Sequence, residues 1–487
     1  MLFNSYLFVF AFLPLALVGY FGLNRLKKEA WAECFLIGMS LWFYAYFNIS
    51  YLPIIIGSVL LNYGCSKLFT RLQSPRAKQA IFALGLIANI GTLFYYKYMG
   101  FFTHIINDVF KTGFFEVSLL LPLGISFFTF QQVSYLIDSY RGKVPAYRFR
   151  EYALFVTFFP QLIAGPIVLH SETVPQFADH TKKQFQWDNF AVGMMEFTRG
   201  MAKKVLIADY FSDTVTWGFE SIAIDTLGGP RALLVMLCYT LQIYFDFSGY
   251  CDMATGIGKM FNIDIPMNFN SPYKACSVTD FWKRWHITLT RFLRTYVYFP
   301  LGGNRKGTAR TYLNLFLVFF ISGLWHGANY TFLAWGMMHG IFMVLERIYT
   351  AKGGKINPII GWCYTFLFVN VAWVFFRAES VSQAVAFMGQ IVSPAGYLAL
   401  FATLQAVLPS GIVALAMSLG SMGTVELSTL TLYMAGLATL CAMFLKNTNE
   451  KIEQFRPTFC NALLSGVLLY VSIICFSGVS AFLYFNF

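Results

Sequence analysis

The sequence predicts an all-α integral membrane protein, with about 11–13 membrane helices and re-entrant or interfacial segments around a central tunnel. Hydrophobic residues make up 57% of the 487 residues and charged residues only 12%, whereas about a quarter of a soluble domain is charged. Aromatic residues reach 19%; Phe is favourable at the bilayer centre, and Tyr and Trp suit its interfaces. These values leave too little polar surface for a chain surrounded by water.

The first apolar run, MLFNSYLFVFAFLPLALVGYFGLNRLKK, carries its basic residues after the run rather than before it. This order predicts a retained first span with an outer N-terminus, not a cleaved signal peptide. Further spans are predicted near 31–47, 51–69, 80–98, 117–138, 152–170, 232–250, 312–330, 331–347, 359–377, 397–419, 427–445 and 460–481.

The stretches between these runs are short, and no internal repeat is evident. Residues 1–487 are therefore expected to form one membrane domain. We expect a catalytic core at about 120–350, followed by C-terminal helices and a tail in 397–487.

The net charge of +12 comes from 35 Lys and Arg against 23 Asp and Glu. In a membrane protein, basic residues gather in short cytoplasmic loops, so nucleic-acid binding is not expected. The basic segments 24–29, 71–79, 141–150 and 446–456 are predicted to face the cytoplasm. A multi-pass protein of the cytoplasmic (inner) membrane, embedded in the lipid bilayer, is the predicted location.

Nine cysteines are scattered through the chain without a C-x-x-C pair. We expect buried free thiols and no metal site. The sequence also lacks a G-x-S-x-G serine elbow, an H-E-x-x-H motif and a P-loop. If the protein is an enzyme, its base is most plausibly a histidine, the side chain that titrates near neutral pH.

The segment 244–304 breaks the apolar pattern, because acidic and basic residues crowd into it between Gly and Pro. A lipid-facing helix cannot carry this sequence. One interpretation is a large cytoplasmic loop with an interfacial helix. The other, which we favour, is a re-entrant segment that lines an internal site, because ionisable residues inside a membrane are usually functional.

Six histidines are candidates, and His326 is the foremost, because it lies in the apolar run FLVFFISGLWHGANYTFLAWG with Gly on both sides. An imidazole there must be hydrogen-bonded or face a cavity, so a packing role and a functional role both remain open. His286, in WKRWHITLT, reads by itself as an interfacial histidine, and His339 as structural. The others, in or near loops without a partner pattern, are His104, His170 and His180.

Three blocks then carry a resemblance to a known family. They are QLIAGPI (161–167), the run from YFDFSGYCDM through FWKRWHITLTRFLRTYVYFPLGGNR, and SGLWHGANYTFLAWGMMHG. Together they resemble a membrane-bound O-acyltransferase of the alginate O-acetyltransferase subunit I type. FPLGGNR after the WKRWHITL block points to this subgroup rather than to teichoic-acid D-alanyl transferases.

The resemblance implies that His326 is catalytic and that His286 is a second, essential or supportive, histidine. We take as substrate-tunnel candidates Asp246, Asp252, Asn268, Lys283, Arg284 and Trp325. The resemblance also implies acetyl-CoA as the acyl donor, with no bound cofactor, and O-acetylation of an extracytoplasmic polysaccharide with the help of a separate SGNH-type acetyltransferase.

The last residues, FLYFNF (482–487), match an F-x-Y-x-x-F pattern of such envelope systems through Phe482, Tyr484 and Phe487. The pattern implies an acyl relay through the Tyr484 hydroxyl; an interfacial aromatic anchor is the alternative. Other functions remain open at this point: D-alanyl or other acyl transfer to a different envelope acceptor, a channel or transporter, and a scaffold of a polymer-export complex.

Overall fold

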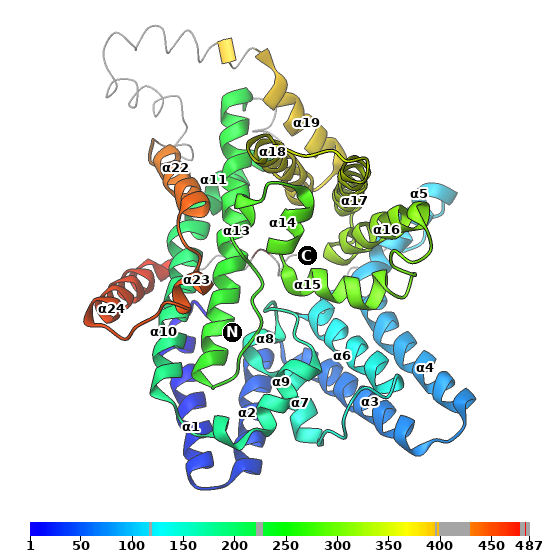
Figure 1. Cartoon of the computed structure of the whole chain (residues 1–487), viewed down its shortest axis with the longest axis vertical. Helices are drawn as coiled ribbons and strands as arrows, with labels where there is room; N and C mark the ends of the chain where they lie inside the picture. The colour runs from blue at the N-terminus through cyan, green and yellow to red at the C-terminus, as the bar shows by residue number, and fades with distance from the viewer. Residues whose placement is uncertain (116–118, 221–226, 395–396, 399–428, 478–482, 484–487) are drawn as a thin grey trace.

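The computed structural model describes residues 1–115, 119–220, 227–394, 397–398, 429–477 and 483 (Figure 1). The regular elements among these residues are helices, as expected. Five are long and apolar enough to cross a membrane: Phe8–Arg25, Ile49–Arg71, Pro75–Phe110, Gly229–Met260 and Pro358–Arg377. The protein is therefore a multi-pass membrane protein.

The first half of the chain forms the helices at the bottom and right of Figure 1, except for its last two helices, which lie on the left side of the picture. Its elements are α1 (Leu13–Arg25), α2 (Glu29–Ala45), α3 (Leu52–Arg71), α4 (Pro75–Leu93), α5 (Met99–Phe110), α6 (Ile125–Tyr140), α7 (Phe149–Thr157), α8 (Phe159–Leu162), α9 (His170–Ala178), α10 (Trp187–Ala202) and α11 (Asp209–Phe219). Several of the junctions are π-helical turns, and the one at Phe94–Tyr98 joins α4 to α5.

The second half begins with the long helix α13 and continues through short helices to the C-terminal region. Its elements are α13 (Gly229–Met260), α14 (Val278–Arg284), α15 (Ile287–Leu293), α16 (Thr308–His326), α17 (Tyr330–Ala351), α18 (Pro358–Arg377), α19 (Val381–Val392), α22 (Thr429–Phe444), α23 (Thr448–Ile452) and α24 (Phe459–Ile474). In Figure 1, α14 and α15 lie between α13 and the α16–α17 pair.

Helix α10 packs directly on α13 through two pairs of glycines. A Cβ atom at Gly193 would lie 2.5 Å from the carbonyl oxygen of Gly256, and one at Gly200 would lie 2.5 Å from that of Gly249. Both helices repeat glycine at seven-residue spacing, which places the small residues on one face and lets the backbones approach closely. The sequence did not predict this helix as a span, because charged residues interrupt its apolar face.

The two lysines of the π-helical turn that follows α10 are paired with aspartates inside the protein. Lys203 Nζ lies 2.6 Å from Asp252 Oδ2, and Lys204 Nζ lies 2.8 Å from Asp246 Oδ1. Buried charges persist only when they are paired, and these pairs tie the π-helical turn after α10 to α13. Polar residues on these helices therefore face protein rather than lipid.

The predicted continuous span at 152–170 is wrong. The segment folds as α7, the single turn α8, a non-helical stretch and the start of α9. Pro160 opens the short turn, and Pro removes a backbone donor and interrupts helices. A Cβ atom at Gly165 would lie 2.6 Å from Gln161 Cα. The segment is buried in protein, which is where irregular backbone is tolerated at membrane depth.

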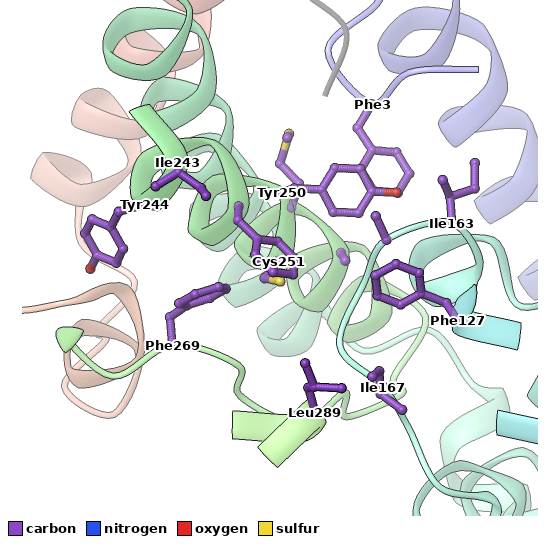
Figure 2. Packing of buried hydrophobic residues seen from close by; sticks show 14 of the residues in the cluster. Phe3, Phe127, Ile163, Ile167, Ile243, Tyr244, Tyr250, Cys251, Phe269 and Leu289 are labelled. Carbon is purple, nitrogen blue, oxygen red and sulfur yellow. The ribbon is translucent and has the colours of Figure 1, made fainter. Parts of the chain in front are cut away.

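Aromatic and aliphatic side chains from distant parts of the sequence fill the centre of the molecule. Figure 2 shows Phe3, from the N-terminal segment, facing Tyr250 of α13, and their ring centroids lie 4.8 Å apart. Ile163 and Ile167, from the broken segment, lie on the same side of α13 in this view. This core joins the first and second halves of the chain into one body around α13.

The C-terminal helices lie beside α10 and α13 (Figure 1). Most of the predicted span 397–419 lies outside the described residues. All nine cysteines are free thiols, but only Cys238 and Cys251 are buried. The expectation of buried thiols is wrong for the rest, which are half-buried or exposed; the exposed ones are Cys34, Cys363, Cys460 and Cys475.

Candidate active site

His326 is the last residue of α16, and close packing of α16 on α17 holds it in place. A Cβ atom at Gly323 would lie 2.4 Å from the carbonyl oxygen of Phe332, and one at Gly336 would lie 2.5 Å from that of Phe319. Helix α17 then begins after Asn329, whose side chain accepts a hydrogen bond from the Thr331 amide. The glycines therefore let two helices cross at the point where the histidine leaves the first of them.

Aromatic rings surround the His326 imidazole. The ring centroids of Trp325 and Trp335 both lie 4.9 Å from that of His326, and the centroid of Phe376 lies 5.1 Å away. Only 3% of the His326 surface is exposed. Such packing excludes bulk water and strengthens every electrostatic interaction of the imidazole.

Two side chains from the helix pair α4–α5 hold the carboxyl end of α16. Lys97 Nζ donates to the carbonyl oxygens of Trp325 at 2.6 Å and His326 at 3.1 Å. The Tyr98 hydroxyl donates to the carbonyl of Leu324 at 2.9 Å. The last carbonyls of a helix lack intrahelical partners and carry a partial negative charge, so a lysine there both caps the helix and fixes the backbone of the histidine.

Sequence reasoning missed Lys97. The signal was available, because a lysine inside the apolar run GTLFYYKYMG is an ionisable residue within a predicted span, and such residues are functional candidates. Its partner could not be predicted, because more than two hundred residues separate Lys97 from Trp325.

His286 lies next to His326, with a distance of 6.5 Å between the ring centroids. It joins α14 to α15 in a left-handed backbone conformation, with φ of 45°, which costs about 1–2 kcal/mol for a residue with a side chain. The His286 side chain is fully buried. The structure thus corrects its interpretation as an interfacial residue.

Asn268 holds the His286 imidazole in place through a hydrogen bond. Its Oδ1 atom lies 3.2 Å from His286 Nδ1 and accepts from the Thr288 hydroxyl at 2.9 Å. The amide oxygen can only accept, so Nδ1 of the neutral imidazole carries the proton and Nε2 keeps its lone pair. Within the described residues, His286 Nε2 is buried and has no hydrogen-bond partner. A buried basic nitrogen is therefore available in this layer.

The block 161–167 is attached to the same layer. The Ile167 amide donates to the Thr288 hydroxyl at 2.9 Å. Arg291 donates to the carbonyl oxygen of Ile167 at 3.2 Å and forms a two-pronged pair with Glu172. These contacts join segment 161–167 to the segment that contains His286. The proximity of His286 to His326 joins that segment in turn to the SGLWHG segment, so the three sequence blocks that resemble the family lie together.

Two cavities lie on opposite sides of His326 along α16. A cavity of about 720 Å³ is lined by Lys97, Arg377 and the residues that follow the histidine, Gly327 to Asn329. A smaller cavity of about 190 Å³ is lined by residues that precede it, including Ser322. The two cavities share no lining residue, and His326 lines neither. The Trp335 ring packs against Phe376, which lines the larger cavity, and against Trp282, which lines the smaller one.

The tunnel candidates fall into three groups. Trp325 and Asn268 belong to the histidine layer, as described above. Asp246 and Asp252 lie on α13 and pair with lysines. In contrast, Arg284 pairs with Asp280 on the half-buried face of α14, and exposed Lys283 lines the rim of the smaller cavity.

Tyr484, Phe482 and Phe487 lie outside the described residues. Leu483, the neighbour of Tyr484, is described: its backbone amide donates to Asp246 Oδ2 at 2.9 Å, and the residue lines the larger cavity. The chain therefore reaches this cavity one residue before the tyrosine.

The other histidines have structural contacts. His339 Nδ1 accepts from Trp282 Nε1 at 3.1 Å, in agreement with a packing role. His170, expected to lack a partner pattern, instead lies 3.1 Å from the Tyr147 hydroxyl and 3.4 Å from Asp138. Among the residues that the structure describes, no group of three or more His, Cys, Asp or Glu could hold a metal ion.

The described residues thus define a polytopic helical membrane protein that holds two buried histidines close together, with a cavity on each side of His326. The model of the MBOAT, membrane-bound O-acyltransferase, family matches residues 63–377. The chain belongs to this family and is an O-acyltransferase.

Similar curated proteins agree with this assignment. The chain is 40% identical to the peptidoglycan O-acetyltransferase of Helicobacter pylori, over 100% of this chain and 98% of that protein. It is 40% identical to the probable alginate O-acetylase AlgI of Pseudomonas aeruginosa, over 79% of this chain and 73% of that protein. The teichoic acid D-alanyltransferase of Bacillus subtilis is 28% identical over 54% of this chain and 70% of that protein.

Proposed function

We propose that the protein transfers acetyl groups from cytoplasmic acetyl-CoA across the inner membrane for O-acetylation of an envelope polysaccharide, with His326 as general base. The observation that carries the proposal is the position of this histidine, buried at the end of α16 between two cavities. A base shared by a donor from one side and an acceptor from the other needs this arrangement.

The direction of transfer follows from the basic loops. Helix α4 begins at Pro75, beside the basic segment 71–79 that we place in the cytoplasm. Lys97 lies 22 residues further along, which is about 33 Å at 1.5 Å per residue and close to the thickness of the hydrocarbon core. The larger cavity, which Lys97 lines, is therefore the outer, acceptor cavity in this proposal.

The smaller cavity is then the one that receives the acyl donor, acetyl-CoA. It lies toward the amino end of α16, next to the basic loop that contains Arg305 and Lys306, and Lys283 and Arg294 line it. Basic side chains can meet the phosphates of coenzyme A. The aromatic layer between the cavities must open for the thioester to reach His326, and its Trp335 ring is the nearest barrier on α17.

In the reaction, the imidazole of His326 accepts the proton of an attacking hydroxyl while that oxygen forms a bond to the thioester carbonyl carbon. The carbon–sulfur bond breaks, and the coenzyme A thiolate takes up a proton as it leaves. His286, with its basic Nε2 in the same layer, supports the charge that develops on His326. The acceptor hydroxyl is that of Tyr484 or of a serine on an extracytoplasmic SGNH-type partner.

We infer a relay through Tyr484 because Leu483 brings the tail to the outer cavity. A covalent acetyl–tyrosine ester divides a transfer across the membrane into two steps. The partner then passes the acetyl group to the polysaccharide.

Peptidoglycan is the acceptor that we propose, because the similarity to the Helicobacter pylori protein covers the full chain, whereas that to the alginate protein covers 79% of it. Muropeptides from cells with and without the protein should be compared by mass spectrometry. Loss of O-acetylated muropeptides is expected in the deletion. Unchanged muropeptides with loss of acetate from another polymer, or of D-alanine from teichoic acid, would contradict this acceptor.

A further inference from the structure

A third cavity, of about 400 Å³, lies away from the histidines between α10, α13, α22 and α24. One part of its wall is basic, with Arg199, Lys203 and Lys451. The opposite part is apolar, with Leu437 and Leu464. The catalytic mechanism above uses none of these residues.

The basic wall has unused capacity for hydrogen bonding. Arg199 Nη1 is buried and has no hydrogen-bond partner among the described residues. Lys203 is neutralised by Asp252, whose second contact is a hydrogen bond from the Thr448 hydroxyl. A buried guanidinium nitrogen without an acceptor is costly, so an acceptor from outside the chain would stabilise it.

The three cations also lie close enough to influence one another. Partial burial, followed by the positive charges of Arg199 and Lys203, lowers the pKa of Lys451. A bound anion relieves this repulsion. A phosphate group fits the arrangement, since guanidinium groups bind phosphate through paired hydrogen bonds and lysine binds it as a point charge.

The apolar wall indicates that the anion belongs to a lipid. Leu437 and Leu464 lie on outward faces of α22 and α24, with 57% and 50% of their surfaces exposed. In a membrane these leucines contact acyl chains. A soluble phosphate compound would leave this wall without a partner, whereas a glycerophospholipid covers it.

The position of the cavity along the helices indicates which leaflet of the bilayer supplies the lipid. Lys451 belongs to α23, within the basic segment 446–456 that we place in the cytoplasm. On the other wall, α13 ends at Met260, and the next turn carries Asp264, which pairs with Lys182 at 2.8 Å at an exposed position. Asp252 lies eight residues before Met260, about 12 Å along the helix from this end, so the basic wall lies near the end of α13 that we place in the cytoplasm.

We propose that the cavity between α10, α13, α22 and α24 binds the phosphate head group of an anionic glycerophospholipid of the cytoplasmic leaflet. Basic pockets between helices on the cytoplasmic side recognise such head groups. Arg199 and Lys451 contact the phosphate, and the acyl chains lie along Leu437 and Leu464. The bound lipid would fill the gap between the C-terminal helices and the catalytic body. The proposal does not depend on the acceptor or the relay.

The full-length protein should be reconstituted in nanodiscs of equimolar phosphatidylglycerol and phosphatidylcholine and analysed by native mass spectrometry. We expect retained phosphatidylglycerol on the wild type and about a tenfold lower retention on Arg199→Gln/Lys451→Gln. Lys352→Gln, an exposed basic residue after α17, is the matched control and should retain the lipid. Equal retention of both lipids by the wild type, or full retention by the double variant, would overturn the proposal.

A second measurement needs no mutation and covers the case of a misfolded variant. Phosphatidylglycerol with a photoreactive group in its acyl chain should cross-link to peptides of α22 and α24 in the wild-type protein. Excess coenzyme A and inorganic phosphate should leave this cross-linking unchanged. Displacement by coenzyme A would reassign the cavity to the acyl donor, displacement by inorganic phosphate would reassign it to a soluble anion, and cross-links elsewhere would exclude a lipid site here.

Discussion

The imidazole of His286 lies 6.5 Å from that of His326, measured between ring centroids, although His286 lies between α14 and α15, His326 ends α16, and the two are forty residues apart. Asn268 fixes one ring through Nδ1, and Lys97 fixes the backbone of the other. Asn268 therefore orients the His286 ring, whereas the His326 ring is held by the aromatic rings that pack around it.

The replacement His286→Asn tests the role of the second imidazole. Asn tolerates the left-handed backbone of this position better than other side chains, so the variant should fold with a melting temperature near that of the wild type. Acetyl transfer should fall roughly 10- to 100-fold, because a supporting base is lost. Wild-type rates with a normally folded variant would show that the imidazole has only a packing role.

The replacement Lys97→Met tests the cap on α16. Two buried carbonyl oxygens lose a charged donor, and each unsatisfied buried group costs about 1–3 kcal/mol. We expect a lower melting temperature in detergent and reduced kcat with little change in KM for acetyl-CoA, because the histidine loses its fixed position. Lys111→Met, at an exposed position after α5, should behave as the wild type. A stable Lys97→Met protein with full kcat would contradict the assignment.

The replacement Gly323→Ala tests the crossing of α16 and α17. The new methyl group would lie 2.4 Å from the Phe332 carbonyl oxygen, so the helices must separate at a cost of about 1–3 kcal/mol. Gly91→Ala, in α4, is the matched control because nothing lies within 4 Å of a Cβ atom there, and it should be neutral or slightly stabilising. Thermal unfolding distinguishes them. Equal melting temperatures would show that the crossing tolerates a side chain.

The replacement Tyr484→Phe tests the acyl relay. Mass spectrometry of the wild type should detect an acetyl-labelled C-terminal peptide. Removal of the hydroxyl should abolish both this label and acetylation of the envelope polymer. Tyr470→Phe, an exposed tyrosine of α24, should leave both unchanged. If the Tyr484→Phe variant acetylates the polymer as the wild type does, Tyr484 is not the acyl acceptor, and the attacking hydroxyl belongs to the partner protein.

The sequence predicts the main features of the site because they depend on local pattern. A histidine flanked by glycines in an apolar run makes His326 the foremost candidate, and α16, α17 and α18 follow the predicted spans closely. The predicted family is confirmed by the family match. These features need no knowledge of distant contacts.

Other features depend on tertiary contacts and could not be read from the pattern. The π-helical turn after α10 carries lysines that pair with α13, so the low hydropathy of this region hides its burial. The hydrogen bond of Asn268 to His286 joins residues on either side of a non-helical stretch and α14. The helix break at Pro160 was missed because the span was predicted from the length of the apolar run, and this run continues across the proline.

The most direct test of His326 as general base is the rate of acetyl transfer from acetyl-CoA by purified His326→Gln protein in proteoliposomes. Gln keeps a polar side chain of similar reach but cannot take up a proton at neutral pH. We predict at least about a hundredfold loss of the rate, with the melting temperature and acetyl-CoA binding retained. A folded His326→Gln protein that transfers acetyl groups at the wild-type rate would contradict the account.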